Sequence, residues 1–272
     1  MSLTVWMSAL FAGVVAIGAS VAIERFGGRL GGLLGSIPTT IVPASIGFWW
    51  SSSNESMARE ALYAVPPGML VTALFLYCWR VIPPRLPQGG LGVRLGIMTA
   101  VSLVIWAIAA SAVVLGMDAN ALPTWVWGVA FFGAQVLFGG WACLRNPPAP
   151  KGSAPVGLGI LLARGTLAAA AIGASVGLAG LGIPLIAGVA SVFPAIFLTT
   201  MLSVWLSQGQ AVQAGAVGPM MLGSASVSAY SLIAAGVMGD LGVGWGSLVA
   251  WCVSVLLISV PAWWWLGRKE QA

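Results

Sequence analysis

The chain contains long stretches without a charged residue, and these constrain its fold more than any other feature. They run over residues 2–23, 30–54, 61–79, 95–117, 119–144, 165–239 and 241–267. About 20 apolar residues cross a ~30 Å hydrocarbon core, so each short stretch can supply one transmembrane helix and the long one can supply three. Only 6% of the 272 residues are charged, against about 25% in a soluble domain. The sequence therefore predicts an all-α polytopic membrane protein.

Two breaks divide the longest stretch. One is the segment 177–184, which contains glycine and proline, and the other is the polar run that begins at Ser207 and continues to Gln213. With these breaks the sequence predicts nine transmembrane helices. The predicted spans are 3–24, 29–51, 59–80, 93–116, 122–143, 159–178, 183–206, 211–237 and 243–266.

The basic residues predict the orientation of these spans. With nine spans, Arg59 lies on one side, and on the other lie Arg25, Arg29, Arg80, Arg85, Arg94, Arg145, Lys151, Arg164, Arg268 and Lys269. The positive-inside rule then predicts an external N-terminus and a cytoplasmic C-terminus. A re-entrant hairpin would alter this count. The net charge of +5 is scattered over short loops, so it indicates orientation in the bilayer and no nucleic-acid partner.

An internal repeat divides the chain. The hexapeptide 16–21 (AIGASV) recurs unchanged at 171–176. Further matches follow in the same order: Gly32 with Gly188, Pro38 with Pro194, Trp49 with Trp205, Ser51 with Ser207, and the segment 65–70 with 217–222. Such colinear blocks indicate duplication of a four-helix unit.

The two copies are predicted to lie in the membrane in opposite orientations, because an odd number of spans separates equivalent points. Residues 1–118 form the first repeat, residues 119–155 a linker helix with a proline-rich cytoplasmic loop, and residues 156–272 the second repeat. Inverted repeats of this kind are common in secondary transporters.

A proline lies near the middle of the second span of each repeat, at Pro38 and Pro194. Proline is well tolerated in the first turn of a new helix, where Ser36 and Ser191 are predicted to act as caps. Two half-helix N-termini would then meet at the midplane, and their N–H groups would suit an anion or a carbonyl-rich solute. The predicted substrate-binding residues are Ser36, Pro38, Thr39, Thr40, Pro43, Ser45, Ser191, Pro194, Thr199, Thr200 and Ser203.

A packing interpretation stands beside this one. The prolines would then only kink packed helices, and the hydroxyls would bond to their own backbone or across helix interfaces. Trp49 and Trp205 are interpreted as interfacial belt residues, with a gate as the alternative. Gln208, Gln210 and Gln213 are interpreted as a polar cytoplasmic surface, with the rim of a cavity as the alternative.

Several functions are disfavoured by what the sequence lacks. It contains no histidine, and its six acidic residues all fall in predicted loops or at predicted span ends. This argues against a carboxylate-lined cation pathway, against a metal site and against the usual catalytic constellations. We therefore expect no enzyme activity, no cofactor and no bound metal.

One short motif resembles a known family. Residues 32–40 (GLLGSIPTT), followed by 57–62 (MAREAL) and a long apolar helix that ends at Arg80, resemble the small four-span bacterial inner-membrane proteins called GlpM-like, whose function is unknown. The second copy, 188–194 (GVASVFP), lacks the Arg-Glu pair and the threonine directly after proline. The resemblance implies a duplicated, fused form of such a protein in the bacterial cytoplasmic (inner) membrane, loosely associated with envelope polysaccharide production.

The sequence thus favours a transporter that works by alternating access, with a small polar solute, neutral or anionic, and the lipid bilayer as its partners. The other hypothesis is a non-transporting scaffold or assembly factor for envelope polysaccharide or lipid production. A homo-oligomer is compatible with either function.

Overall fold

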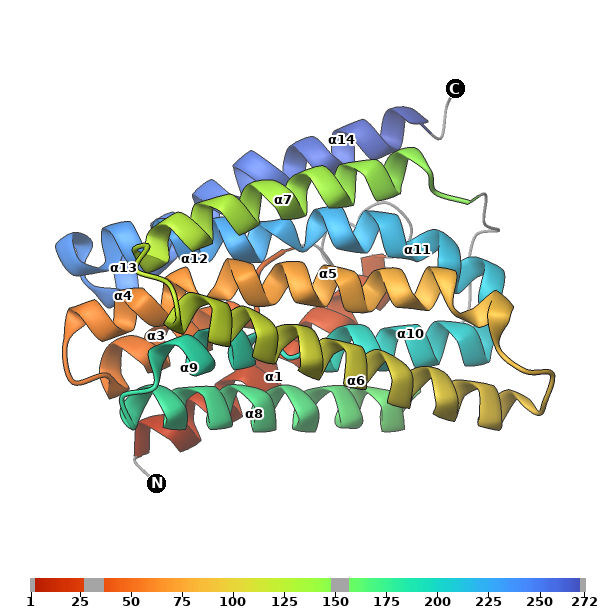
Figure 1. The fold of residues 1–272 in the computed structure, drawn as a ribbon, viewed down its shortest axis with the longest axis horizontal. Helices are drawn as coiled ribbons and strands as arrows, with labels where there is room; N and C mark the ends of the chain where they lie inside the picture. Colours follow the sequence, from red (N-terminus) through yellow and green to blue (C-terminus); the bar gives the residue numbers. More distant parts are fainter. Residues whose placement is uncertain (1–2, 27–36, 148–156, 270–272) are drawn as a thin grey trace.

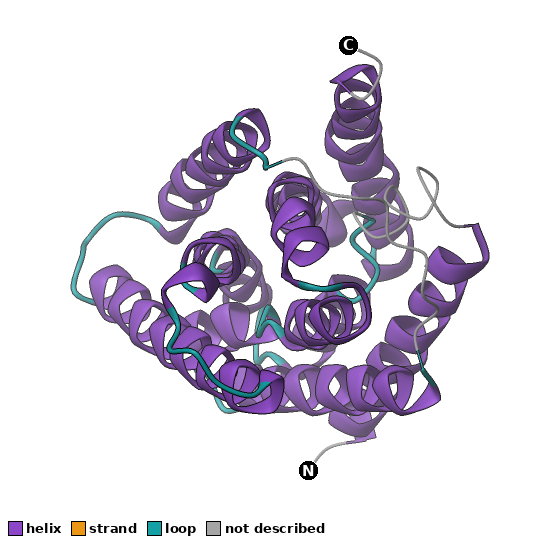
Figure 2. Cartoon of the chain, turned by 90° about the vertical axis from the view of Figure 1, so that its right-hand side faces the viewer, coloured by secondary structure: helices purple, strands orange, loops and turns teal. Residues whose placement is uncertain are grey.

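A computed structural model describes residues 3–26, 37–147 and 157–269. Helices and short connections account for these residues, and no strand occurs among them (Figure 2). A 3-10 turn covers Pro83–Arg85 and a π-helical stretch covers Val255–Ser259. The α-helices are α1 (Leu3–Phe26), α3 (Ile41–Ser51), α4 (Glu55–Tyr63), α5 (Val65–Val81), α6 (Leu91–Asp118), α7 (Thr124–Leu144), α8 (Leu158–Gly180), α9 (Pro184–Ser191), α10 (Ala195–Gln208), α11 (Gln210–Gly223), α12 (Ala225–Leu241), α13 (Val243–Ser254) and α14 (Val260–Lys269).

Seven helical stretches of the described residues are long and apolar enough to cross a membrane. They are Glu55–Val81, Leu91–Asp118, Thr124–Leu144, Leu158–Gly180, Pro184–Leu206, Gln210–Leu241 and Val243–Leu266. These stretches confirm seven of the predicted spans, with the largest differences at Glu55 against residue 59 and at Leu241 against residue 237. The described part of α1 adds a shorter apolar helix, Leu3–Gly18. The chain is an all-α, multi-pass membrane protein.

The helices run roughly along one axis, with α5 in the middle of the bundle, α4 at one end of it and α6 at the periphery (Figure 1). In Glu55–Val81 78% of the most apolar window is buried, against 17% in Leu91–Asp118. Large apolar side chains face outward from the outer helices, among them Leu115, Leu137 and Leu257. Lipid is the solvent that such a surface requires.

Local sequence signals explain several helix boundaries. Asn54 precedes α4, and its side chain accepts a hydrogen bond from the Met57 N–H at 3.0 Å, as an N-cap residue does. Prolines occupy the first turn of α5, where a missing N–H costs nothing. Gly209 and Gly242 have φ of 88° and 74°, and this left-handed backbone lets the chain reverse after α10 and α12.

Helices α1 and α8 pack against each other in antiparallel directions. A Cβ on Gly13 would lie 3.1 Å from the Gly165 carbonyl oxygen, and one on Gly173 would lie 3.1 Å from the Ala9 Cβ. Later residues of α8 therefore meet earlier residues of α1. Small residues allow this close approach of the two backbones. The two helices carry the duplicated hexapeptide.

The two ends of the bundle differ in charge. Arg80, Arg85, Arg94 and Arg145 lie where α5 and α7 end and α6 begins, at the end of the bundle where α14 also finishes (Figure 1). We call this the basic end. The opposite end carries the acidic residues Glu55, Glu60, Asp118 and Asp240, together with Arg59.

Candidate functional site

The helical run between Pro184 and Gln208 is interrupted. Helix α9 ends at Ser191 and α10 begins at Ala195, with Pro194 as its N-cap. No side chain caps α10, and the Ser191 hydroxyl donates to the Gly188 carbonyl at 2.7 Å. The prediction that Ser191 caps the new helix is therefore wrong. Since Ser191 is still the last residue of α9, its hydroxyl lies against its own preceding turn.

The interruption leaves a backbone carbonyl without a helical partner, and α5 supplies one. The buried Thr72 hydroxyl donates to the Val192 carbonyl at 2.9 Å and accepts from Trp106 Nε1 at 3.1 Å. The Trp106 ring also packs edge-on against Phe193, with centroids 5.3 Å apart. Residues of the first half thus hold the break in the second half in place.

The first half has a comparable helix start. Residues 37–40 are not helical, Pro38 is buried, and α3 begins after Thr40 without a side-chain cap. The Thr39 N–H donates to the Ile37 carbonyl at 2.8 Å. Pro43 lies in the first turn of α3 and is buried. Ser36 lies outside the described residues.

Ser45, one turn further into α3, belongs to a buried chain of hydroxyls. Its oxygen lies 2.6 Å from the Tyr230 hydroxyl, which lies 2.7 Å from the Ser247 hydroxyl. The three residues come from α3, α12 and α13, so this chain joins the two halves. Ser45 also donates to the Val42 carbonyl at 2.8 Å.

Thr199 of α10 contacts a buried charged side chain. The Arg164 Nε donates to the Thr199 hydroxyl at 3.2 Å, and Arg164 is 5% exposed. Arg164 lies six residues after the first residue of α8, which corresponds to about 9 Å along the helix axis. Thr199 and Thr200 also donate to carbonyls of their own helix, and Ser203 is buried one turn beyond Thr199.

Apolar side chains fill the region where the two proline-associated helix starts converge. Ile41 of α3 and Val192 of the α9–α10 break belong to one buried cluster, together with Met69 and Tyr230. Backbone packing nearby is also tight, because a Cβ on Gly188 would lie 2.1 Å from the Ala61 carbonyl oxygen. The structure therefore places the helix starts near both prolines beside one apolar cluster. The hydroxyl groups predicted to bind a substrate form hydrogen bonds with separate partners.

The residues predicted as gate or rim lie mainly toward the basic end. Trp205 is 4% exposed and packs edge-on against Trp79, with centroids 6.0 Å apart. The belt interpretation of Trp205 is therefore wrong, because other parts of the protein cover its ring. Trp49 is half-buried. Gln213 is fully buried, and its amide nitrogen donates to the Trp79 carbonyl at 3.0 Å. The surface interpretation is thus also wrong for Gln213.

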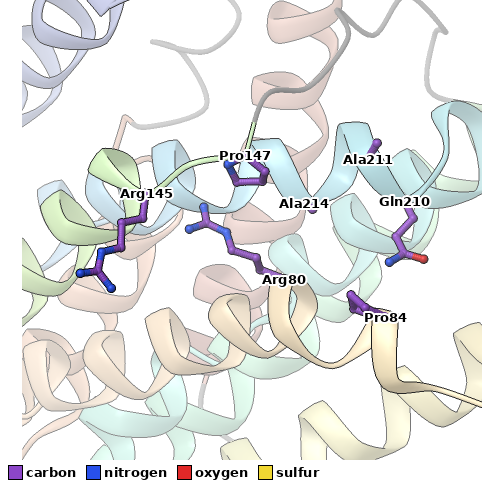
Figure 3. Close-up of a pocket in the computed structure, with 7 residues that line it drawn as sticks. All are labelled: Arg80, Pro84, Arg145, Pro147, Gln210, Ala211 and Ala214. Atoms are coloured by element: carbon purple, nitrogen blue, oxygen red, sulfur yellow. The ribbon is translucent and has the colours of Figure 1, made fainter.

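Gln210 lies beside a pocket of about 520 Å³ at the basic end. Its Oε1 accepts a hydrogen bond from Arg94 at 3.2 Å. The Gln208 side chain lies outside the described residues. The pocket is lined by Arg80, Pro84, Arg145, Pro147, Gln210, Ala211 and Ala214 (Figure 3).

Comparison with protein-family models, with curated proteins and with solved structures finds no match for this chain. Among the described residues, no group of three His, Cys, Asp or Glu side chains could hold a metal ion.

Sequence reasoning missed several of the polar residues that the structure places inside the bundle. Tyr230 and Thr72 lie within predicted spans, so their depth was visible in the sequence but their partners were not. Gln135 is a further case: it is fully buried in α7, and its amide bonds to Ser224 at 3.1 Å and Ser228 at 2.5 Å. A glutamine in the middle of an apolar span was the available signal.

Proposed function

We propose that this protein is a membrane transporter for a small polar solute, neutral or anionic, which works by alternating access between two inverted halves. The observation that carries the proposal is the buried Arg164 guanidinium, hydrogen-bonded to Thr199 one turn beyond the α9–α10 break. A charge within a membrane-spanning helix is costly, and such residues usually serve a pathway or a binding site.

Helix packing supports the inverted arrangement. If the second half repeats the first, α8 corresponds to α1, α10 to α3, and α13 to α6. The contacts between α1 and α3 recur between α8 and α10, and those between α6 and α10 recur between α13 and α3. Together with the antiparallel α1–α8 pair, this exchange of equivalent contacts is what an inverted duplication produces.

The helix starts near the prolines support a central site. Neither α3 nor α10 has a side-chain cap. The Ala195 N–H donates to the Phe193 carbonyl at 2.7 Å, and the N–H groups that follow it in the first turn of α10 are left for a ligand. The partial positive charge of a helix N-terminus favours an anion or a carbonyl oxygen there. In this proposal the apolar cluster around Ile41 and Val192 belongs to a closed conformation, and the site opens when the halves move apart.

A permanently packed scaffold for envelope assembly is the second candidate, and one observation favours it. Ser45, Ser191, Thr199 and Thr200 all donate to carbonyls of their own helices. Hydroxyls that serve only packing behave in this way. Unlike the transporter, a scaffold never needs to admit water to these positions.

Cysteine accessibility separates the two candidates without knowledge of the solute. Cys78, Cys143 and Cys252 are replaced by alanine, and single cysteines are then introduced by Thr40→Cys and Thr199→Cys. A small, membrane-impermeant thiol reagent is applied in turn to each side of the membrane. We expect Thr199→Cys to react from both sides, because each conformation would open the site to one of them.

Exposed loop positions provide the matched controls. Ser53→Cys and Gln88→Cys lie in connections at opposite ends of the bundle and should each react from one side only. If these controls react while Thr40→Cys and Thr199→Cys stay protected from both sides, the transport proposal fails and the scaffold is favoured.

A further inference from the structure

We infer that the pocket at the basic end binds an anionic group, a carboxylate or a phosphate, next to a short apolar portion of the same ligand. This site is separate from the residues around the α9–α10 break, and the inference does not depend on transport. The pocket has a volume of about 520 Å³ and is largely open to its surroundings.

The charge of the lining favours an anion. Arg80 of α5 and Arg145 after α7 both line the pocket, and no acidic residue is among the described residues that line it (Figure 3). Gln210 contributes an amide; since its oxygen already accepts from Arg94, its nitrogen offers a further donor. Guanidinium groups match the geometry of carboxylates and phosphates.

Both arginines interact with neutral groups, which do not cancel their positive charge. Arg80 donates from Nη1 to the Ala142 carbonyl at 2.9 Å, and from Nη2 to the Asn146 side-chain oxygen. The Arg145 guanidinium lies over the Trp141 ring, 5.2 Å from its centroid. Neither contact neutralises the guanidinium. Arg80 is oriented before a ligand arrives, which lowers the ordering cost of binding, whereas the Arg145 guanidinium points away from Arg80 (Figure 3) and turns toward the pocket only when a ligand is bound.

The remaining lining is small and apolar: Pro84, Pro147, Ala211 and Ala214. The pocket lies where α5 and α7 end and α11 begins, at the end of the membrane-crossing stretches. Both a soluble carboxylate or phosphate and the headgroup of an anionic lipid present this combination of charge and short apolar chain. Basic pockets between helices at a membrane surface bind such headgroups.

Thermal unfolding of the purified full chain in a neutral detergent tests the site. Inorganic phosphate is titrated against sodium chloride of equal ionic strength, and short-chain phosphatidylglycerol is titrated against short-chain phosphatidylcholine. We expect phosphate, phosphatidylglycerol or both to raise Tm in a saturable way. Arg145→Gln should raise the half-saturating concentration roughly tenfold to a hundredfold, as the loss of one charge-assisted hydrogen bond implies.

Arg85→Gln is the matched control, because Arg85 is exposed at the same end and does not line the pocket. Arg145→Gln is preferred to Arg80→Gln, since Arg80 also holds Asn146. A response to phosphate alone assigns the site to a soluble anion, and a response to phosphatidylglycerol alone assigns it to a lipid headgroup. The inference is overturned if neither raises Tm beyond its control, or if Arg85→Gln weakens the response as much as Arg145→Gln.

Discussion

At the α9–α10 break a single buried hydroxyl serves two partners. Thr72 donates to the Val192 carbonyl and accepts from the Trp106 indole, and it is itself fully buried. In a membrane protein lipid cannot replace either bond, so a polar group left without a partner is expensive. The break is therefore tolerated because a residue far away in the sequence supplies the missing donor.

Thr72→Val should lower the free energy of unfolding by about 1–3 kcal/mol, since it preserves shape and leaves both partners unsatisfied. Thermal or denaturant unfolding in detergent measures the change. Thr166→Val is the control, because the exposed Thr166 hydroxyl bonds only to its own helix, and the expected loss there is below about 0.5 kcal/mol. Equal losses in the two variants would show that Thr72 does not support the break.

At the scale of the helix, Pro219 leaves another backbone carbonyl without its usual donor, inside α11. Its missing N–H removes the bond that would normally go to the Gly215 carbonyl, four residues earlier. The Asn146 side chain, just beyond α7, donates to that carbonyl at 2.7 Å and accepts from Arg80 of α5. Close packing completes the junction, because a Cβ on Gly218 would lie 2.7 Å from the Asn146 Oδ1. Three helices are thereby joined at one irregular point.

This junction predicts coupling between two substitutions. Asn146→Ala alone should cost about 1–3 kcal/mol of unfolding free energy, because it leaves the Gly215 carbonyl and an Arg80 N–H unpaired. In a Pro219→Ala background the helix supplies its own donor to Gly215, so the same substitution should cost about 0.5–1.5 kcal/mol less. A double-mutant cycle of unfolding measurements gives this difference.

Pro87→Ala provides the comparison, because Pro87 lies in the exposed connection between α5 and α6. It should show no coupling to Asn146→Ala. Additive losses in the Asn146 and Pro219 cycle would mean that the Asn146–Gly215 bond does not replace the missing helical one.

For the whole molecule, the separation of charge between the two ends has a consequence for orientation. The basic end carries Arg80, Arg85, Arg94 and Arg145, whereas the opposite end carries most of the acidic residues. The positive-inside rule predicts that the basic end faces the cytoplasm. The direction of α14 then brings its last residue to the same side.

Side-specific labelling of the cysteine-free protein checks this orientation. Gln88→Cys, between α5 and α6, should react only from the cytoplasmic side, and Ser53→Cys, between α3 and α4, only from outside. Asn120→Cys, in the connection between α6 and α7, should also react only from outside. Reaction of Gln88→Cys from outside would reverse the predicted topology. Reaction of all three from one side would contradict the bundle direction itself.

The sequence by itself determined the fold class, the seven described membrane-crossing stretches and the position of the prolines beside α3 and α10. Those features depend on the hydrophobicity of consecutive residues and on the backbone restrictions of proline and glycine, which act over a few residues. Hydropathy alone was sufficient for them because a bilayer demands long apolar helices whatever their neighbours are.

Only the tertiary structure decided which polar side chains meet. Contacts between different helices decide this: Arg164 bonds to Thr199, Thr72 bonds to Val192, and Trp205 packs against Trp79. Ser191 shows the same limit, since its spacing from Pro194 allowed a cap and the path of the chain turned its hydroxyl toward Gly188. Such partners depend on how whole helices pack, and a local pattern does not specify that packing.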